Sequence, residues 1–334
     1  MATRIPTWLS GLLLPLGLCY GAAMWVRALA FRIGLRRSYA PGVPVICVGN
    51  LTVGGTGKTP VVATVVSLLQ AMGRRPMILS RGYKSKDGQS DEAMLLEKLT
   101  GAPVVVDPDR VDGAVAAIGR GADVLVMDDG FQHLRLRRDL DIVLIDATNP
   151  FGGGWCLPAG LLREPVSGLK RAGLVVITRG AQVAPAALAK LERSVRRRTS
   201  VPILFAHHAP KEFRSLTGET APLDSLTAPA VAFCGLGNPD GFFATLEAVG
   251  VELAGTTHCA DHAHYTPELM AQLEAVAAES GATSLVTTEK DGVKLDPAWF
   301  TMPLWQLAIE MQFSGSDATL RDALSAALGV EGEA

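Results

Sequence analysis

The chain has 334 residues, of which 48% are hydrophobic, and its formal net charge at pH 7 is −2. This length allows two domains with separate cores, and the apolar content excludes a largely disordered chain. The five cysteines form no CxxC pair and are odd in number, which indicates a reducing compartment and argues against a disulfide framework.

Charged residues are unevenly distributed along the chain. The first acidic residue is Asp87, whereas eleven of the 31 lysines and arginines precede it. A cationic, apolar segment therefore precedes an acidic body, and such a segment suits an anionic partner such as lipid headgroups or nucleotide phosphates. We expect no nucleic-acid partner, because the sequence shows no interleaved basic and aromatic residues and no recognised nucleic-acid motif.

The first apolar stretch runs from Trp8 to Val26, 19 residues without a charge, and is followed by Arg27, Arg32, Arg36 and Arg37. It permits a transmembrane helix, a cleaved signal peptide or a helix buried in the domain. A proline and three glycines weaken the transmembrane interpretation, and export would separate the phosphate loop that follows from cytoplasmic ATP. We favour a helix in the membrane interface, with apolar residues in the acyl boundary and arginines at the headgroups.

The stretch from Val43 to Pro60 reads as a buried strand, a glycine-rich turn and the start of a helix over 61–72. Backbone N–H groups and a helix N-terminus surround phosphate oxygens in such a loop, while Lys58 supplies positive charge and the Thr59 hydroxyl reaches Mg²⁺. The pattern G-x-x-x-x-G-K-[ST] is matched except at its first position, which is Thr52. The sequence therefore predicts binding of ATP or GTP.

Short apolar strands alternate with helices after this loop. Strands are expected at 76–80, 104–106, 124–128, 141–146 and 174–178, and helices from 91 and over 109–121 and 185–198. This alternation predicts an α/β fold of the P-loop NTPase kind, a mostly parallel sheet covered by helices. One strand ends at Asp128 and Asp129, where a nucleotide enzyme places a metal-binding carboxylate.

The pattern weakens at 208–230, where three prolines interrupt it. A second αβ unit follows, with expected strands at 230–234 and 284–288 and helices at 241–249, 267–280 and 317–328. The chain is therefore expected to have four parts: an N-terminal membrane-associating helix in 1–40, a P-loop core in 41–207, a link in 208–230 and a smaller α/β lobe in 231–334.

Two polar clusters lie outside the phosphate loop. Residues 258–264 hold three histidines, a cysteine and an aspartate, but no second ligand group at a zinc spacing accompanies them. A catalytic histidine explains this cluster better, with a simple loop turn at Asp261 as the alternative. Residues 128–133 place two acids, an amide and an imidazole together, and a purely structural role poorly explains so many polar groups.

Taken together, these residues resemble the bacterial tetraacyldisaccharide 4′-kinases, which phosphorylate a lipid A precursor at the inner membrane. The loop from Val48 to Pro60 is similar to the family's own version, which also lacks the first glycine. Two positions depart from the family's pattern: Ser90 to Ala93 replaces Gly-Asp-Glu-Pro, and Leu161 stands where the family usually has proline. Further similar motifs are Ser80–Tyr83, Asp128–His133, Leu157–Gly160, Leu162–Pro165, Asp261-His262 with Tyr265, and Thr288–Asp291.

The resemblance implies an enzyme that transfers the γ-phosphate of ATP to the 4′-hydroxyl of a tetraacylated disaccharide 1-phosphate, with Mg²⁺. It implies a catalytic pair of Asp91, which takes the hydroxyl proton, and His262, which orients or relays it, with Lys58 neutralising charge. Thr59 and Asp128 are the expected metal ligands, with Asp129 as the alternative carboxylate. Expected ATP contacts are Thr52, Val53, Gly54, Gly55, Thr56, Gly57, Lys58, Thr59, Glu289 and Asp291, and expected substrate contacts are Asn50, Arg81, Asp129, Gln132, His133, Arg163 and Glu164.

The implied substrate also indicates where the protein works. Lifting one acyl chain of about ten methylenes into water would cost on the order of 8 kcal/mol. We therefore expect the protein to act docked on the cytoplasmic face of the bacterial inner membrane, either peripheral or anchored by its single helix, with no obligate protein partner. The alternative function is a membrane-associated P-loop ATPase switch, which has no phosphoryl acceptor other than water.

Overall fold

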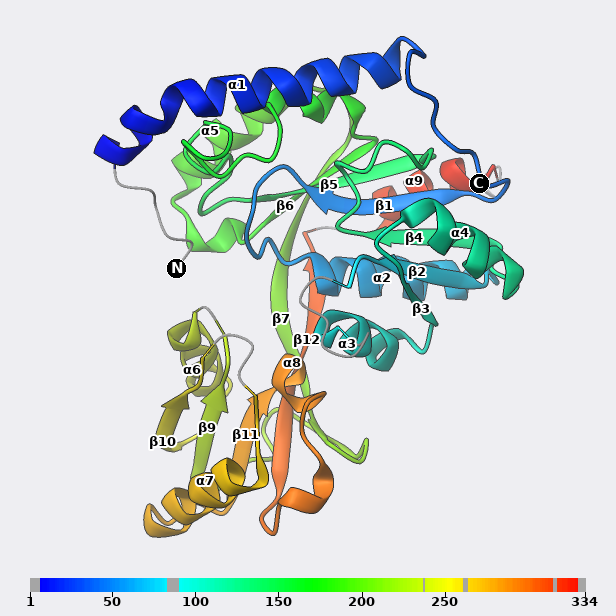
Figure 1. Ribbon diagram of the computed structural model, residues 1–334. Coiled ribbons are helices and arrows are strands. Elements are labelled where there is room, and N and C mark those ends of the chain that lie inside the picture. The colour runs from blue at the N-terminus through cyan, green and yellow to red at the C-terminus, as the bar shows by residue number, and fades with distance from the viewer. Residues whose placement is uncertain (1–6, 83–89, 237, 261–263, 315–316, 330–334) are drawn as a thin grey trace. The chain divides into compact units, whose positions relative to one another are not determined.

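The computed structural model of the chain describes residues 7–82, 90–236, 238–260, 264–314 and 317–329 (Figure 1). The chain forms two compact units. The larger consists of the described residues of 7–207 and 311–329, and the smaller of those of 208–310. Two strands, β7 (Ile203–Ser215) and β12 (Leu304–Phe313), contribute residues to both units.

The larger unit is built on a parallel sheet with the strand order β7-β6-β5-β1-β4-β2-β3. Five of these strands are buried along their whole length, because helices cover both faces of the sheet, and they therefore appear in the sequence as continuous apolar runs. The expected parallel sheet is confirmed. Its remaining strands are β1 (Val45–Asn50), β2 (Pro76–Ser80), β3 (Val104–Val106), β4 (Val124–Asp128), β5 (Leu140–Asp146) and β6 (Leu174–Thr178).

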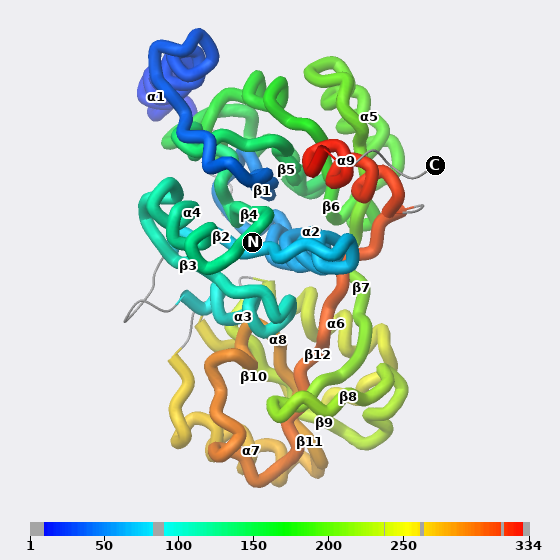
Figure 2. The backbone as a smooth tube through the Cα atoms, turned by 90° about the vertical axis from the view of Figure 1, so that its right-hand side faces the viewer, coloured from blue at the N-terminus to red at the C-terminus, as the bar shows by residue number. Residues whose placement is uncertain are grey.

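Alternate side chains of each strand enter two different cores, one on each face of this sheet. In β1, Val45 and Cys47 join the first core, whereas Ile46 and Val48 join the second. The first core also holds residues of α4 (Arg110–Gly119) and α5 (Pro185–Arg196). The second holds residues of α2 (Lys58–Ala71), α3 (Asp91–Thr100) and α9 (Ala318–Leu328) (Figure 2).

The position of α9 differs from the expectation that it closes the smaller lobe. Leu320 and Leu324 are wholly buried in the second core of the larger unit, together with the valines of α2. The spacing of apolar residues in α9 predicted a helix, but it did not predict which strands the helix would cover. Since β12 returns the chain to the larger unit before α9 begins, the helix packs there.

In the smaller unit, the strands β10, β9, β11 and β12 are neighbours in this order and pair in parallel. The stretch 208–230, expected as a link, contains the second half of β7 and its short antiparallel neighbour β8 (Thr220–Ala221). Pro210 lies within β7 and concealed this strand in the sequence, because proline is unusual inside strands. The other elements of this unit are β9 (Ala230–Cys234), α6 (Pro239–Ala248), β10 (Leu253–His258), α7 (Pro267–Glu279), β11 (Ser284–Thr288) and α8 (Glu289–Gly292).

Three short 3₁₀ helices complete the description: η1 (Val166–Arg171) and η2 (Gly180–Gln182) in the larger unit, and η3 (Pro297–Trp299) in the smaller. In the smaller unit, α7 packs on one face of the sheet and α6 on the other. Both units therefore have the same α/β construction, and in each the carboxyl ends of the parallel strands lie along one edge.

Helix α1 (Thr7–Arg32) lies along the larger unit, against the segment that follows β5 (Figure 1). Two glycines allow this close approach. A Cβ added to Gly17 would lie 2.8 Å from the Cβ of Ala159, and one added to Gly21 would lie 3.2 Å from the Sγ of Cys156. One side of α1 is thus fixed on the protein.

The other side of α1 is exposed and apolar. The exposed fraction is 72% for Leu12, 59% for Leu16, 52% for Trp25 and 57% for Val26. By length and composition the helix could cross a membrane, and only 11% of its most apolar window is buried. These exposures do not fit a core helix, and the apolar surface suggests membrane association.

Candidate active site

The loop between β1 and α2 has the geometry of a phosphate cradle. Gly54 and Gly57 adopt φ angles of 110° and 81°, which side chains other than glycine rarely tolerate. A Cβ added to Gly54 or Gly55 would meet no atom within 4 Å, so packing against the protein does not explain these glycines. Close approach of a ligand does explain them, because the first N–H groups of α2 have no partner within the helix and attract phosphate oxygens.

Thr52 has a backbone conformation that does not require glycine. Among the described residues other than glycine, only Asp129 and Arg179 have a positive φ. Thr52 forms an antiparallel bridge with Leu162, and the N–H of Val53 donates to the carbonyl of Leu161 at 2.8 Å. The departure from the common loop pattern is therefore accommodated by extended backbone that is paired with a neighbouring segment.

Lys58 points from the start of α2 toward the strand ends. Its Nζ lies 3.7 Å from Oδ1 of Asp129 and 3.4 Å from Oδ1 of Asn50. Asp129 also accepts a bidentate pair from the Arg163 guanidinium, at 2.7 and 2.9 Å. Burial alone would raise the pKa of Asp129, but the hydrogen bonds from Arg163 and the charge of Lys58 outweigh it and lower the pKa. Asp129 is therefore an ionised carboxylate held between two cations.

The preceding residue, Asp128, is in the opposite electrostatic state. It is 5% exposed, and its Oδ1 has no hydrogen-bond partner among the described residues. Burial, reinforced by the nearby charge of Glu92, raises the pKa of Asp128 to about 7. A desolvated carboxylate oxygen without a partner is a favourable ligand for a divalent cation, which would remove the cost of its ionisation.

Thr59 and Asp128 are suited to Mg²⁺. No cluster of three or more His, Cys, Asp or Glu side chains that could hold a metal occurs in the described part of the chain. Mg²⁺ needs no such cluster, because it binds through one or two protein oxygens and completes its shell with water and phosphate. The orphaned oxygen of Asp128 makes it a better ligand than Asp129, whose oxygens are already bonded to Arg163.

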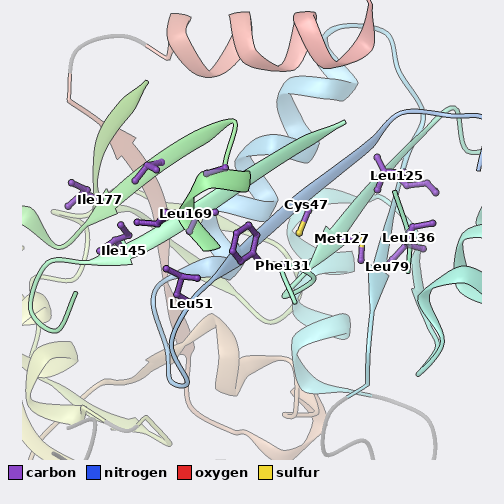
Figure 3. Close-up of a cluster of buried hydrophobic side chains, with 14 of the residues drawn as sticks. Cys47, Leu51, Leu79, Leu125, Met127, Phe131, Leu136, Ile145, Leu169 and Ile177 are labelled. Atoms are coloured by element: carbon purple, nitrogen blue, oxygen red, sulfur yellow. The ribbon is translucent and has the colours of Figure 1, made fainter. Parts of the chain in front are cut away.

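A buried phenylalanine anchors the loop that carries these aspartates. Phe131 is wholly buried, close to Cys47 and Leu51 in the first core (Figure 3). A Cβ added to Gly49 of β1 would lie 2.8 Å from the Cβ of Phe131, so glycine is required for this contact. The anchored loop keeps the polar residues on either side of Phe131 at the strand ends.

A cavity of about 670 Å³ opens beside the phosphate loop, on the side of β4 and β2. Of the expected substrate contacts, Arg81, Asp129, Gln132, His133 and Arg163 line this cavity. The structure therefore brings together five residues that are as much as 82 positions apart in the sequence. The other lining residues are Tyr20, Met24, Arg27, Thr52, Val53, Gly54, Lys58, Ser80, Glu92, Pro108, Arg110 and Asp128.

Asn50 and Glu164, also expected to contact substrate, do not line the cavity but are hydrogen-bonded to residues that do. The amide of Gln132 donates to the Asn50 carbonyl at 3.0 Å and to Oε1 of Glu164 at 2.8 Å. Arg163 donates to the carbonyl of Asn50 at 3.0 Å and also to its side-chain oxygen. Glu164 is buried and pairs with Arg171 at 2.8 Å. Both residues position neighbours that line the cavity.

His133 is neutral at pH 7. Burial and the nearby positive charge of Arg110 lower the pKa of His133 to about 4. Arg110 is 3% exposed and donates to the carbonyls of Asp107 at 2.9 Å and Asp128 at 3.1 Å. The sequence analysis did not identify Arg110 as a site residue. The sequence nevertheless indicates that Arg110 is unusual, because the first turn of a helix is an unfavourable place for a cation.

Helix α1 contributes directly to this cavity, which the sequence reading also missed. The Tyr20 hydroxyl donates to the carbonyl of Arg163 at 3.1 Å, and Arg27 donates to the carbonyl of Gln132 at 2.9 Å. Tyr20, Met24 and Arg27 line the cavity on one side of the helix. The exposed apolar surface of α1 and the charged cavity thus meet on a single helix.

The expected catalytic pair is described only in part. Asp91 is the first residue of α3 and is partly buried, and its neighbour Glu92 lines the cavity. Glu92 was not expected at the site. His262, with Asp261, lies outside the described residues.

Glu289 and Asp291 have partners within the smaller unit. Asp291 is wholly buried, and its Oδ2 accepts hydrogen bonds from the N–H of Gly235 at 2.9 Å and the hydroxyl of Thr288 at 2.7 Å. Glu289 accepts from the N–H of Ile309 at 3.2 Å. The expected contact of these two residues with ATP stays a prediction.

Comparison with known proteins assigns the chain to one family. The family model described as Tetraacyldisaccharide-1-P 4′-kinase matches residues 9–329. Tetraacyldisaccharide 4′-kinase of Syntrophotalea carbinolica is 42% identical over 323 residues, covering 90% of this chain and 87% of its own length. The corresponding protein of Geobacter metallireducens is 44% identical over 310 residues, covering 86% and 88%.

A solved structure agrees with these relatives. The crystal structure of LpxK from Aquifex aeolicus in complex with ATP superposes with a TM-score of 0.79 at 28% sequence identity. The superposition covers 96% of this chain and 99% of the other. The similarity thus extends over both units, and the protein of the solved structure binds ATP.

Proposed function

The chain belongs to the tetraacyldisaccharide 4′-kinase family, and on this premise we propose how its residues perform the family's reaction. The activity is ATP-dependent phosphate transfer to a tetraacyldisaccharide in lipid A biosynthesis. We propose that the acceptor is the 4′-hydroxyl of the disaccharide 1-phosphate. The observation that best supports this proposal is the charged cavity beside the phosphate loop, which shares α1 with an exposed apolar surface.

The phosphates of ATP occupy the loop between β1 and α2. There Lys58 exchanges its contact with Asp129 for phosphate oxygens, while Asp129 keeps its bidentate contact with Arg163. Lys58 then neutralises the charge that develops as the phosphoryl group moves. Asp129 holds Arg163 at the cavity wall and, before ATP binds, also holds Lys58.

Mg²⁺ would be held by the Thr59 hydroxyl and the Asp128 carboxylate. When bound, the ion would neutralise negative charge on the phosphate oxygens during transfer. Asp128 meets this role because its unpartnered oxygen lies at the end of β4, in register with Val48 of β1. Arg110 fixes the backbone of Asp128 through the carbonyl and thereby orients the carboxylate.

The acceptor hydroxyl is deprotonated by the pair that the family's motifs indicate. Asp91 is at the N-terminus of α3, and we propose that its carboxylate accepts the proton while His262 orients or relays it. The neutral imidazole of His133 and the guanidiniums of Arg81 and Arg163 bind polar groups of the sugar. The acyl chains follow the apolar side of α1 toward the membrane.

We place the protein on the cytoplasmic face of the inner membrane, where ATP is available. The exposed residues of α1 supply the docking surface, so the substrate's chains need not leave the bilayer. The helix could also span the bilayer, and its apolar length permits this.

The experiment that tests the function measures the fate of the γ-phosphate. Purified full-length protein in mixed micelles is incubated with [γ-³²P]ATP, Mg²⁺ and tetraacyldisaccharide 1-phosphate. The label is expected on the lipid, at the 4′ position. Release of label only as inorganic phosphate would favour the membrane-associated ATPase switch and overturn the kinase assignment for this chain.

The catalytic pair is tested by Asp91→Asn and His262→Ala. Each substitution is expected to lower the transfer rate at least tenfold at saturating ATP, because each removes a group that handles the acceptor proton. ATP affinity should change less than threefold. Glu97→Gln, an exposed substitution on the same helix as Asp91, is the matched control. Undiminished transfer in both variants would exclude this pair.

A further inference from the structure

A wholly buried carboxylate lies in the smaller unit, just after the carboxyl end of β11. Asp291 of α8 accepts hydrogen bonds at its Oδ2 from the N–H of Gly235 at 2.9 Å and from the hydroxyl of Thr288 at 2.7 Å. Its Oδ1 lies 3.7 Å from Nζ of Lys294. All three partners belong to the smaller unit. A buried ion pair adds little stability compared with apolar side chains of similar volume, so stability alone does not account for Asp291.

Three segments of the smaller unit meet around Gly235, the residue that follows β9. A Cβ added to Gly235 would lie 3.0 Å from Oδ1 of Asp291 and 3.1 Å from the hydroxyl oxygen of Tyr265. It would also lie 2.9 Å from the carbonyl oxygen of Ala260. Glycine is required at this position because a side chain would force these atoms apart. A carboxylate, a phenol and a backbone carbonyl from distant parts of the sequence are thus brought to one point.

Tyr265 is packed firmly in this cluster. It is 2% exposed, and its ring meets the ring of Phe233 in β9 edge to face, with centroids 5.9 Å apart. The ammonium of Lys294 lies 5.6 Å from the centroid of the Tyr265 ring. Burial and the negative charge of Asp291 raise the pKa of Tyr265, so its hydroxyl keeps the proton at neutral pH and remains a donor. Tyr265 therefore joins the core of the smaller unit to the buried carboxylate.

The backbone on the other side of residues 261–263 is held by the same strand. The N–H of Cys259 donates to the carbonyl of Cys234, the last residue of β9, at 2.9 Å. Ala260 follows and lies against Gly235. The described chain is thus fixed immediately before and shortly after the segment 261–263, which includes His262.

We propose that Asp291 is a positioning residue for His262; this inference rests on the proposed role of His262 in handling the acceptor proton. Asp291 fixes Gly235 and faces Tyr265, and these two residues hold the chain on either side of the segment 261–263. Proton transfer by an imidazole requires hydrogen-bond reach and correct orientation, and a misplacement of about 1 Å can cost about a hundredfold in rate. Asp291 thus acts on the reaction through the backbone, without contacting ATP or the acceptor.

Asp291→Asn and Tyr265→Phe test this role, because each changes one polar group and keeps the shape of the side chain. Transfer by the full-length protein is measured at saturating ATP and lipid, and ATP affinity is measured by calorimetry. We expect Asp291→Asn to lower kcat at least tenfold and Tyr265→Phe to lower it about fivefold. The Kd for ATP and the KM for the lipid should change less than threefold, because neither residue contacts a substrate.

Asp296→Asn is the matched control for Asp291→Asn. Asp296 is exposed in the same unit and accepts from the N–H of Ala298 at 2.9 Å, which an asparagine oxygen can also do. Its kcat should equal that of the wild type. Thermal unfolding shows which variants fold, and if Asp291→Asn does not fold, Tyr265→Phe decides the outcome by the same criteria.

Combination with His262→Ala separates positioning from a structural effect. If Asp291 acts through His262, Asp291→Asn should lower kcat less than twofold further once the imidazole has been removed. A tenfold loss in both backgrounds would overturn the inference, as would wild-type kcat of Asp291→Asn or a tenfold loss of ATP affinity. If His262→Ala itself transfers phosphate at the wild-type rate, the proposed catalytic pair fails. A loss in His262→Ala together with an unchanged Asp291→Asn would overturn the positioning role alone.

Discussion

On one side of the phosphate loop, β4 ends at two aspartates and β2 ends next to Arg81, whereas on the other side a smaller cavity beside β6 and the first half of β7 is lined by Leu188 and Phe205. Both sides belong to one parallel sheet, and β4 and β6 are wholly buried. The difference lies in the residues that line each side: Arg81, Asp128 and Asp129 on one, and Leu188 of α5 and Phe205 within β7 on the other. Charge is therefore concentrated on the side where the proposed phosphate transfer would take place.

On the charged side of the loop, the adjacent residues Asp128 and Asp129 show how strongly the position of a carboxyl group affects its pKa. Asp128 ends the buried part of β4 and has an oxygen without a described partner, whereas Asp129, with a φ of 52°, turns toward Lys58 and Arg163. One carboxyl group therefore has a raised pKa and the other a lowered pKa. The positive φ directs the second carboxylate away from the environment of the first.

The largest effect is expected on the charged side, from Lys58→Met. Removing this cation should lower the single-turnover rate of transfer by about 10² to 10³, or about 3–4 kcal/mol in the barrier, because the charge acts mainly in the transition state. ATP affinity should fall less, since the N–H groups of the loop remain. The rate at saturating ATP is the measurement.

Lys190→Met, an exposed change on α5, is the matched control for that experiment. A rate of Lys58→Met within threefold of the wild type would show that the charged side does not act on the moving phosphoryl group. The proposed contrast between the two sides of the loop would then be wrong.

The second-largest effect is expected from Asp128→Asn. This substitution should slow transfer about hundredfold but should stabilise the protein against unfolding in the absence of ligands. The folded-state pKa of about 7 lies above the unfolded value near 3.9, so the folded protein holds this proton more tightly. The contribution of Asp128 to stability therefore falls as pH rises from about 4 to about 7. The Tm of Asp128→Asn should exceed that of the wild type at pH 8, and the difference should shrink at pH 5.

Asp129→Asn is the natural counterpart, with the opposite sign. Its pKa is lowered in the folded state, so its ionised form stabilises the protein at neutral pH and loses this effect as pH falls. The Tm of Asp129→Asn should lie below that of the wild type at pH 8. Shifts of the same sign in both variants would contradict the electrostatic difference between the two residues. Differential scanning calorimetry from pH 5 to pH 8, without nucleotide or metal, measures both.

The parts of the site that could be read from the sequence are those fixed by local pattern. Glycine spacing and Lys58 identify the phosphate loop, and the apolar run before Asp128 identifies a strand end. The alternation of short apolar strands with helices likewise predicted the parallel sheet. These features depend on a few neighbouring residues.

Features set by contacts between distant segments could not be read in this way. Arg27 meets Gln132, 105 positions away, and Tyr20 meets Arg163, 143 positions away. Nothing near α1 in the sequence indicates these partners, because strand register and the packing of Gly17 and Gly21 bring them together. The position of α9 was missed for the same reason: an amphipathic helix does not specify which sheet it covers.

The smallest effect is expected at the outer surface of α1, from the double substitution Leu12→Gln and Leu16→Gln. These side chains are 72% and 59% exposed, and partial burial of two leucines in a bilayer interface is worth at least about 1.4 kcal/mol, or tenfold in partitioning. Binding to vesicles of phosphatidylethanolamine and phosphatidylglycerol, measured by sedimentation, should fall about tenfold. Val115→Gln on α4, at a position 52% exposed, is the control.

This last substitution also refines the contrast between the two sides of the loop. Tyr20 and Arg27 connect α1 to the charged cavity, and no residue of α1 lines the cavity at β6 and β7 among the residues described there. Transfer to vesicle-bound lipid should therefore decrease with vesicle binding, while ATP affinity in solution stays unchanged. Unchanged vesicle binding would assign the exposed leucines no part in docking. If ATP affinity fell together with vesicle binding, α1 would act on both sides of the loop, because changing its outer surface would then alter both activities.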